Sequence, residues 1–415
     1  MNLVFNKWDS LGNPIPNLSE LNTTTDVTTF PFFINDINFN IKKCKLVDIN
    51  QNDKFYFIIT HKFSYTFYIK NGEIFLPKEI EHYINNSNLK IVFLCEGESN
   101  KHIDTFMLLL IKKIKNNNWL EENFYIIDNN SMLYKLKDAL KTKVNVFKIN
   151  YLINVYFKKQ NLKIIDKNNI LTDKKFIFLC QNRNPHYHRI LLLTHLKNLN
   201  LFENDIVNWS LIINHSDYAS SYTNSPNISS LGHFKNYLDF NNKKLIKDYK
   251  FICDIDKLCF YNENIDWSNT INTYDWNVDF KTLKGKQNFE NSYINIITES
   301  QYHHREYGVH ISEKSFKPFY FFQIPIFLAS YNHVKMMKEE YNLHFFDDLI
   351  DHSYDDESDD SKRFHMIVNE INRLSNMREE ISLYYKSNID KLIHNHNFIK
   401  NNNYDEIFKQ YILNI

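Results

Sequence analysis

The sequence predicts an α/β protein built from two Rossmann-like domains that face a cleft. Short β-rich runs alternate with segments whose apolar residues recur every three or four positions, and this alternation occurs in both halves of the chain. Alternation of this kind indicates βαβ units, in which helices cover both faces of a parallel sheet. A chain of 415 residues also exceeds the usual size of one hydrophobic core, which favours two domains.

The first half contains several runs that we expect to form strands. They are KFYFIIT at 54–60, LKIVFLCEG at 89–97, NFYIID at 123–128 and KVNVFKIN at 143–150. Between the second and third runs, a helix is expected because apolar residues recur at helical spacing: Ile103, Phe106, Met107, Leu110, Ile111 and Ile114. A polar stretch at 158–175 follows, so we assign residues 1–165 to the N-terminal domain.

The second half repeats the pattern. A strand is expected at 175–180 (KFIFLC), and a helical pattern follows it. The later runs expected to form strands are DYKFICDID at 248–256, SYINIITES at 292–300 and QIPIFLAS at 323–330. From Lys362 the apolar residues return to helical spacing. We assign 175–385 to the second domain and 386–415 to a C-terminal helical tail.

The composition excludes several classes of protein. Hydrophobic residues make up 43 per cent of the chain, with 34 Phe and 26 Tyr, which is too apolar and aromatic for a disordered chain. Lys plus Arg number 49, and Asp plus Glu also number 49, so the formal net charge is zero. Nucleic acid could therefore be bound only through a local basic patch. No apolar run is long enough to span a membrane. Five scattered cysteines without a CxxC pair favour a reducing compartment, and we expect the cytoplasm.

One segment of the second half has the features of an anion-binding site. INIITES at 294–300 is an expected buried strand that delivers Glu299 at its carboxyl end. A polar loop then leads to HISEKSFKPF at 310–319, where a helix is expected to begin. Ligands of α/β sheets bind outside the carboxyl ends of the strands, so this segment lies where a ligand is expected.

The start of this helix offers two kinds of anion-binding group and one carboxylate that can accept hydrogen bonds. Ser312 or Ser315 can cap the helix, whose first N–H groups and dipole attract an anion. Lys314 would add a full charge against a diphosphate, and the Glu313 carboxylate can accept hydrogen bonds from two ribose hydroxyls. Pro318 indicates a late or kinked helix. The alternative is that Glu313 and Lys314 form a solvated first turn, because the dipole favours Glu there.

The segments INIITES, HISEKSFKPF and IPIFLA together resemble the donor-site signature of the α1,3-fucosyltransferase family, with Ser-Glu-Lys in place of Thr-Glu-Lys. The resemblance covers about residues 175–375, and the stretch at 345–374 also resembles uncharacterised phage and marine-microbial glycosyltransferase-like proteins. It implies a GT-B fold and transfer of a sugar, with inversion and without a metal, from a nucleotide diphosphate sugar to an acceptor hydroxyl. A GDP-sugar is the donor that the family implies.

The resemblance also implies roles for individual residues. The family's Glu binds the nucleotide ribose and its Lys binds the diphosphate, which correspond to Glu313 and Lys314. A family Arg that contacts phosphate corresponds to Arg183 or Arg189, and Arg189 fits better because it opens the expected helix. The alternative for either Arg is a surface or helix-capping cation.

Inverting transfer requires a base that removes the proton of the acceptor hydroxyl, and the N-terminal domain is expected to supply it. Glu96 and Glu98 follow an expected buried strand, with Gly97 allowing a sharp turn between them. They resemble the family's base segment, in which Gly and Glu follow a strand. The alternative is that both are solvated loop carboxylates.

Two other functions compete with this prediction. Asp254 and Asp256 follow YKFIC in a strand-then-DxD pattern, by which metal-dependent glycosyltransferases hold Mn²⁺ or Mg²⁺ on the donor diphosphate. The other alternative is a non-catalytic sugar- or nucleotide-binding structural protein. HHRE at 303–306 lacks a third metal ligand, and the acidic run at 355–360 is expected to be a solvated loop.

Overall fold

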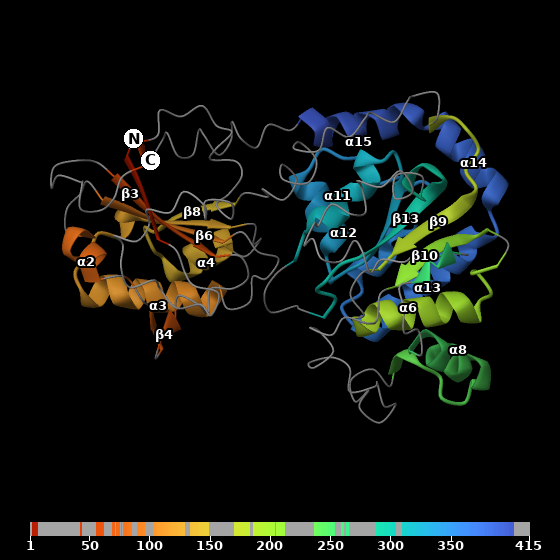
Figure 1. Cartoon of the computed structure of the whole chain (residues 1–415), viewed down its shortest axis with the longest axis horizontal. Coiled ribbons are helices and arrows are strands. Elements are labelled where there is room, and N and C mark those ends of the chain that lie inside the picture. The colour runs from red at the N-terminus through yellow and green to blue at the C-terminus, as the bar shows by residue number, and fades with distance from the viewer. Residues whose placement is uncertain are drawn as a thin grey trace. The chain divides into compact units, whose positions relative to one another are not determined.

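The computed structural model describes the chain in segments, and all structural statements concern these. They are residues 2–6, 42–43, 55–61, 69–70, 72–74, 76, 78–84, 89–95, 103–128, 133–148, 170–182, 186–203, 205–211, 236–253, 259–260, 263–264, 288–303 and 309–401. The chain forms two compact units, and Figure 1 shows that each has a sheet with helices beside it. Unit 1 comprises 1–159, 304–310 and 403–415, and unit 2 comprises 160–303 and 311–402. The sequence-based boundary at 165–175 lies slightly later than the end of the first stretch of unit 1.

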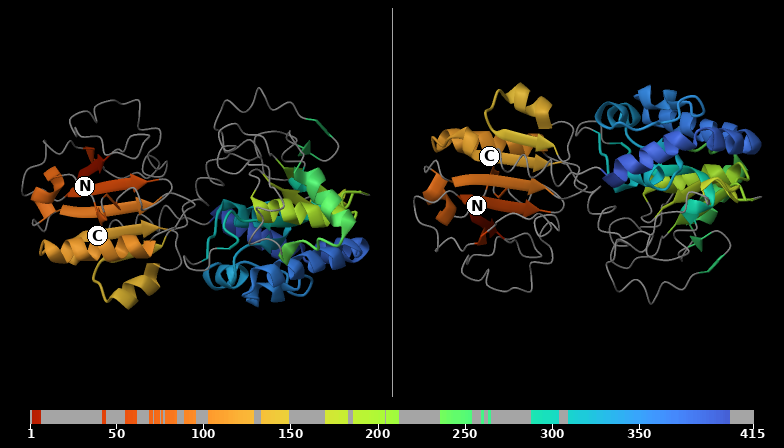
Figure 2. Two further views of the ribbon diagram at one scale, coloured as in Figure 1. Left: turned by 90° about the horizontal axis from the view of Figure 1, so that it is seen from below. Right: turned by 90° about the horizontal axis from the view of Figure 1, so that it is seen from above.

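Unit 1 contains a sheet in which every neighbouring pair of strands is parallel, in the order β2-β1-β3-β6-β7-β8 (Figure 2). Its elements are β1 (Asn2–Asn6), β2 (Lys42–Lys43), β3 (Phe55–His61), the hairpin of β4 (Ile69–Lys70) and β5 (Glu73–Ile74), α2 (Lys78–Ile84), β6 (Leu89–Cys95), α3 (Ile103–Asn116), the 3-10 turn η5 (Glu121–Asn123), β7 (Phe124–Asp128), α4 (Leu133–Leu140) and β8 (Asn145–Lys148). The expected strands of this half are confirmed.

Helix α3 is the helix expected between the second and third runs. Its six apolar residues at helical spacing are all buried and join the core beneath the sheet. Asp104 in its first turn and Lys113 and Lys115 in its last complement the helix dipole. The apolar spacing therefore predicts both the helix and the face that it buries.

Unit 2 contains a mixed sheet in the order β12-β11-β10-β9-β13-β14, in which β10, β9, β13 and β14 are parallel and β11 and β12 are antiparallel. Its elements are β9 (Phe176–Gln181), α6 (Tyr187–Asn198), β10 (Val207–Leu211), α8 (Lys243–Cys253), β11 (Cys259–Phe260), β12 (Glu263–Asn264), β13 (Ser292–Thr298), α11 (Glu313–Tyr320), β14 (Ile324–Leu328), α12 (His333–Glu340), the 3-10 turn η9 (His352–Asp356), α13 (Asp360–Ser375), α14 (Arg378–Ser387) and α15 (Ile389–Asn401).

The strand order of unit 2 contains a topological switch point between β9 and β13. From β9 the chain passes through α6 to β10 on one side, whereas β13 lies on the other side and leads through α11 to β14. Right-handed crossovers then put α6 and α11 on opposite faces of the sheet, as Figure 1 shows. A crevice is expected outside the carboxyl ends of two strands whose helices diverge in this way.

One expected strand of unit 2 is wrong. The run at 248–256 was expected to be a strand, but Lys243–Cys253 is helix α8. Leu245, Tyr249 and Ile252 are buried at spacings of four and three, which is a helical pattern. The helix begins at Lys243, so the run at 248–256 contains only its second half and hides this pattern. Asp254 and Asp256 therefore follow a helix rather than a strand, and they lie outside the described residues.

The C-terminal helices expected after Lys362 are confirmed as α13, α14 and α15. Helix α15, which falls in the predicted tail, packs against α11 within unit 2. His396 of α15 hydrogen-bonds through Nδ1 to the carbonyl of Tyr320, the last residue of α11, at 2.6 Å. The tail thus supports the helix that begins with the Glu-Lys pair. No helix in the described part of the chain combines the length and apolar character that a bilayer crossing needs.

Candidate functional site

Helix α11 begins immediately beyond the carboxyl end of the sheet. Every residue of β13 is buried, and the backbone N–H of Glu299 donates to the carbonyl of Leu328 at the end of β14 (3.1 Å). Ser312 is the N-cap of α11, and its hydroxyl accepts from the backbone N–H of Lys314 at 3.2 Å. Pro318 lies inside the helix, so it neither delays the start nor ends it. Of the two candidate caps, the structure assigns the role to Ser312.

Glu299 is fully buried beneath this helix start. Its Oε1 accepts from the Ser315 hydroxyl at 2.5 Å and from the Ser312 backbone N–H at 3.2 Å. The Ser312 hydroxyl lies 2.9 and 2.8 Å from its two oxygens, and Ser300 N–H lies 3.3 Å from Oε2. Since the protein itself surrounds both oxygens with donors, we interpret Glu299 as the residue that fixes the start of α11.

Ser315 and His333 extend this network, and no motif in the sequence marks His333 as part of it. Nε2 of the buried His333 lies 3.0 Å from the Ser315 hydroxyl oxygen. A hydroxyl has one proton, and the short contact with Glu299 directs it to the carboxylate. His333 must therefore donate its Nε2–H to Ser315, so the network runs from His333 through Ser315 to Glu299 and joins the first turns of α12 and α11.

The Glu313–Lys314 pair is not a solvated first turn. Glu313 is only 5 per cent exposed, and its Oε2 is buried with no hydrogen-bond partner among the described residues. The Lys314 side chain is 22 per cent exposed, and its ammonium lies 3.2 Å from Glu313 Oε1 and 3.3 Å from the Ser312 hydroxyl. A buried acceptor without a donor is costly, so this carboxylate oxygen suits a ligand that brings a hydroxyl.

Arg189 lies at the switch point between β9 and β13. It is buried in the first turn of α6, and its Nη2 donates to the carbonyl of Thr298, the last residue of β13, at 2.8 Å. Thr298 in turn donates its hydroxyl to Asn182 at 2.6 Å. Arg189 is therefore not a surface cation, and it lies at the same edge of the sheet as α11. Arg183 lies outside the described residues.

His188, next to Arg189, binds the same edge. Its Nε2 donates to the carbonyl of Glu299 at 2.8 Å. Burial lowers the pKa of His188 well below its ordinary value, and the neighbouring Arg189 charge lowers it further. His188 is therefore neutral at neutral pH, which suits a donor that holds a backbone carbonyl and carries no charge.

The loop after Glu299 is held by a network around Arg363 of α13. Arg363 is buried, its Nη2 lies 2.6 Å from Asp360 Oδ1, and its guanidinium lies 4.6 Å from the centre of the Tyr302 ring. Asp360 also accepts from His303 Nδ1 at 3.0 Å. Tyr302 stacks on His188, with ring centres 5.5 Å apart. His303 thus has a structural partner, and the remainder of HHRE, 304–306, lies outside the described residues.

The acidic run at 355–360 was expected to be a solvated loop, which is wrong for Asp355. Its carboxylate is buried and accepts from the backbone N–H groups of Val334 and Lys335, each at 2.9 Å, so it caps α12. Asp359 similarly accepts from Lys362 N–H and caps α13. Helices with unpaired first N–H groups gain from such carboxylates, so two acidic residues of this stretch have a capping role.

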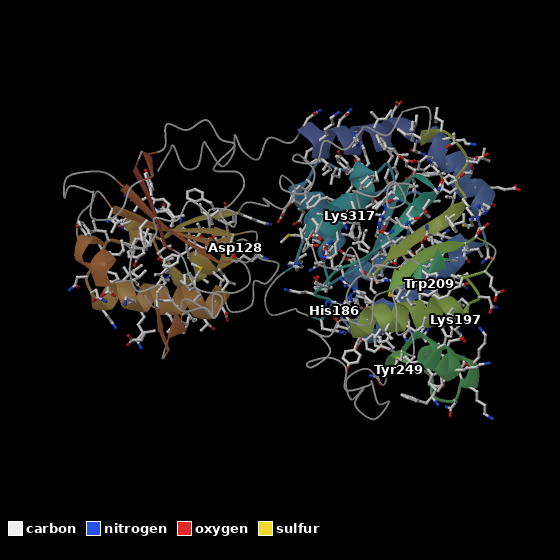
Figure 3. The ribbon with its side chains drawn as sticks, in the orientation of Figure 1. Asp128, His186, Lys197, Trp209, Tyr249 and Lys317 are labelled. Atoms are coloured by element: carbon white, nitrogen blue, oxygen red, sulfur yellow. The ribbon has the colours of Figure 1, made fainter. Side chains whose placement is uncertain are left out.

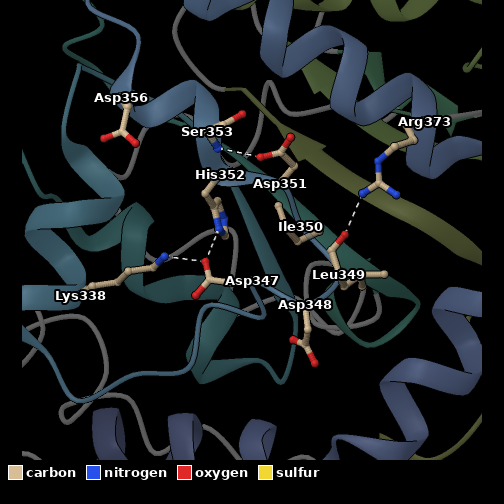
Figure 4. A pocket seen from close by; sticks show the side chains of 10 residues that line it. All are labelled: Lys338, Asp347, Asp348, Leu349, Ile350, Asp351, His352, Ser353, Asp356 and Arg373. Carbon is tan, nitrogen blue, oxygen red and sulfur yellow. Dashed lines mark hydrogen bonds and ion pairs between the residues drawn. The ribbon is translucent and has the colours of Figure 1, made fainter.

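An open cavity of about 550 Å³ is lined by residues between Lys338 and Arg373 (Figure 4). Several of its charged groups are occupied by the protein: Asp347 pairs with Lys338 and His352, and Arg373 donates to the carbonyl of Leu349. None of the predicted site residues lines it. Size alone therefore does not make this cavity the candidate site.

In unit 1, the carboxyl end of the sheet carries a carboxylate besides the two predicted glutamates. Glu96 and Glu98 lie outside the described residues, directly after β6. Asp128 ends the neighbouring strand β7 and is buried at the same edge of the sheet (Figure 3). The prediction that Glu96 or Glu98 is the base stays a prediction.

Within the described residues, no three His, Cys, Asp or Glu side chains come together in a way that could hold a metal ion. No protein-family model and no curated protein matches this chain. The candidate site therefore rests on its own geometry: the Glu313–Lys314 pair, the capped start of α11, and Arg189 at the adjacent switch point.

Proposed function

We propose that this protein is a glycosyltransferase of the GT-B type that moves a sugar from a nucleotide diphosphate sugar to an acceptor hydroxyl. The observation that carries the proposal is the buried Oε2 of Glu313, which lacks a hydrogen-bond partner among the described residues and lies beside the Lys314 ammonium. A nucleotide diphosphate brings both groups that such a pair requires, ribose hydroxyls for the carboxylate and phosphoryl oxygens for the ammonium.

The existing contacts prepare Lys314 for a diphosphate. Its ammonium is held by Glu313 and Ser312, so little side-chain entropy remains to be lost on binding. The charge of Glu299 is met by internal donors, and the dipole of α11 adds positive potential at the same point. When the bond from sugar to diphosphate breaks, Lys314 and the helix start would stabilise the departing negative charge.

In this mechanism a carboxylate of the N-terminal domain, Glu96 or Glu98, removes the proton of the acceptor hydroxyl as the sugar develops positive charge. The hydroxyl oxygen attacks the anomeric carbon from the side opposite the diphosphate, which inverts the configuration. Lys314 supplies the charge that a metal would otherwise supply. A GDP-sugar is the donor we propose, because the resemblance to the α1,3-fucosyltransferase family implies it.

Ligand-induced stabilisation tests the proposal. GDP-, UDP- and dTDP-sugars are added with Mn²⁺ or with EDTA, and a ligand that binds the native state raises Tm. The donor should stabilise the protein equally well in EDTA. Lys314→Met and Glu313→Gln should each weaken donor binding about tenfold or more, since each loses a charge-assisted contact.

Lys335→Met and Glu339→Gln are matched controls, because they remove the same charges from exposed residues of α12. Both should bind the donor as the wild type does. Unchanged donor affinity in the Lys314 and Glu313 variants would contradict the proposed role of this pair in donor binding. Activity that disappears in EDTA would favour the metal-dependent alternative, and donor binding without transfer to any acceptor would favour a non-catalytic binding protein.

A further inference from the structure

Helix α8 presents a stripe of lysines to solvent on the side opposite its buried face. Lys243, Lys247 and Lys250 are exposed and follow one another at spacings of four and three, which places them along one line of the helix. The buried residues Leu245 and Tyr249 lie on the opposite side. Among the described residues none of the three lysines has an ion-pair partner, so their charges face solvent.

The remaining charges of α8 are used to hold the helix in place. Lys244 pairs with Asp248 (3.6 Å) and donates to the carbonyl of Asn198 at the end of α6 and to Oδ1 of Asn200 (3.2 Å). Asp248 is buried. The lysine stripe is therefore separate from the contacts that fix α8 on α6, and it can be changed without loosening them.

Two large aromatic side chains, one on α8 and one shortly before it in the sequence, are also exposed. Phe251 follows Lys250, is 47 per cent exposed, and has the Lys197 ammonium of α6 4.2 Å from its ring centre. Phe240, three residues before α8, is 42 per cent exposed. Figure 3 labels Lys197 and Tyr249 on these two neighbouring helices. Asp239, beside Phe240, is also exposed, and the three lysines outnumber it.

We propose that the exposed face of α8, with Phe240 and Phe251, docks on an anionic lipid surface. Lysines along one side of a helix attract anionic headgroups, and nearby phenylalanine rings can enter the boundary between headgroups and acyl chains. This inference does not depend on the proposed function. Nucleic acid fits this surface less well. Proteins that bind single strands combine a basic groove with aromatic rings and often use the bidentate guanidinium of Arg, whereas α8 presents an outward helix face and contains no Arg.

Vesicle co-sedimentation tests the proposal with the full chain. The wild type should bind phosphatidylcholine vesicles that contain phosphatidylserine and should not bind vesicles of phosphatidylcholine alone. Because the chain has no net charge, binding must come from a local patch. Raising the salt concentration should weaken it.

The decisive variant replaces Lys243, Lys247 and Lys250 by Glu, and vesicle binding should fall about tenfold or more. Its matched control replaces Lys335, Lys362 and Lys400 by Glu as well. These are also exposed helical lysines of unit 2, so the net charge of the protein changes by the same amount. The control should bind as the wild type does, and Phe251→Ser should weaken binding with no change in Tm beyond a few degrees.

Three results would overturn the proposal. They are failure of the wild type to bind phosphatidylserine vesicles, an equal loss of binding in the control, and binding of a single-stranded oligonucleotide in preference to the vesicles. Circular dichroism of each variant shows whether the fold is kept. If the triple α8 variant does not fold, Lys247→Gln with Lys250→Gln removes two charges without reversing them and should still weaken binding.

Discussion

The hydroxyl of Ser315 lies 2.5 Å from Oε1 of Glu299, although sixteen positions separate the two residues. This contact connects the end of β13 to the first turn of α11, and the Glu299 side chain is fully buried. Glu299 therefore acts through the helix that it holds. A variant at Glu299 should change stability as well as any ligand binding at the helix start.

Glu299→Gln should lower the free energy of unfolding by about 2 kcal/mol. The amide keeps one acceptor oxygen but turns an NH₂ group toward the serine donors, so at least one buried hydrogen bond is lost. Urea denaturation measures the change. Glu339→Gln on the exposed side of α12 is the control and should change stability by less than about 0.5 kcal/mol.

His333 should tolerate Gln better than Leu. Because His333 donates its Nε2–H to Ser315, a Gln side chain can supply an N–H at a similar reach, whereas Leu cannot. We expect a loss of about 1 kcal/mol for His333→Gln and about 2 to 3 kcal/mol for His333→Leu in urea denaturation. Equal losses would show that the Ser315 contact contributes nothing beyond packing.

Asp360 should make stability depend on pH in the acid range. Burial raises the pKa of Asp360, but hydrogen bonds from His303 and Arg363 outweigh it and lower the pKa from 3.8 to about 2. A pKa that is lower in the folded than in the unfolded chain stabilises the fold above about pH 4, and this contribution disappears as the pH falls toward 2. It amounts to up to about 2 kcal/mol.

Asp360→Asn tests this dependence through denaturation curves at several pH values. The variant should be less stable than the wild type at neutral pH, and the difference should shrink as the pH falls from about 4 to about 2. A difference that stays constant over this range would contradict the assignment. His303 is partly exposed, so its hydrogen bond to Asp360 remains open to solvent screening.

Asp355→Ala should cost about 2 kcal/mol, because the carboxylate accepts from two backbone N–H groups at the start of α12. Its neighbour Asp356 is exposed and has no side-chain hydrogen bond among the described residues, so Asp356→Ala serves as the control. The control should change stability by less than about 0.5 kcal/mol in urea denaturation. A comparable loss in both variants would contradict the capping role.

Part of the candidate site could be predicted from the sequence. Ser312 as a cap, Glu313 and Lys314 at the helix start, and Glu299 at the end of a buried strand follow from local patterns of three to seven residues. The burial of Glu313 and the role of His333 could not be predicted, because no local pattern specifies what covers a helix start. The run at 248–256 was expected to be a strand but belongs largely to helix α8. Local patterns therefore mislead when the run that is considered begins inside an element, since α8 begins at Lys243.

The sequence by itself determined the α/β class, most strands, the long helices and the location of the Glu-Lys pair at a helix start. These depend on apolar periodicity and capping, which act over a few residues. Only the tertiary structure decided the strand order that puts β9 beside β13, and the chain of hydrogen bonds from His333 through Ser315 to Glu299. Such contacts join residues that are distant in sequence, and the packing of whole elements, rather than local spacing, brings them within hydrogen-bonding distance.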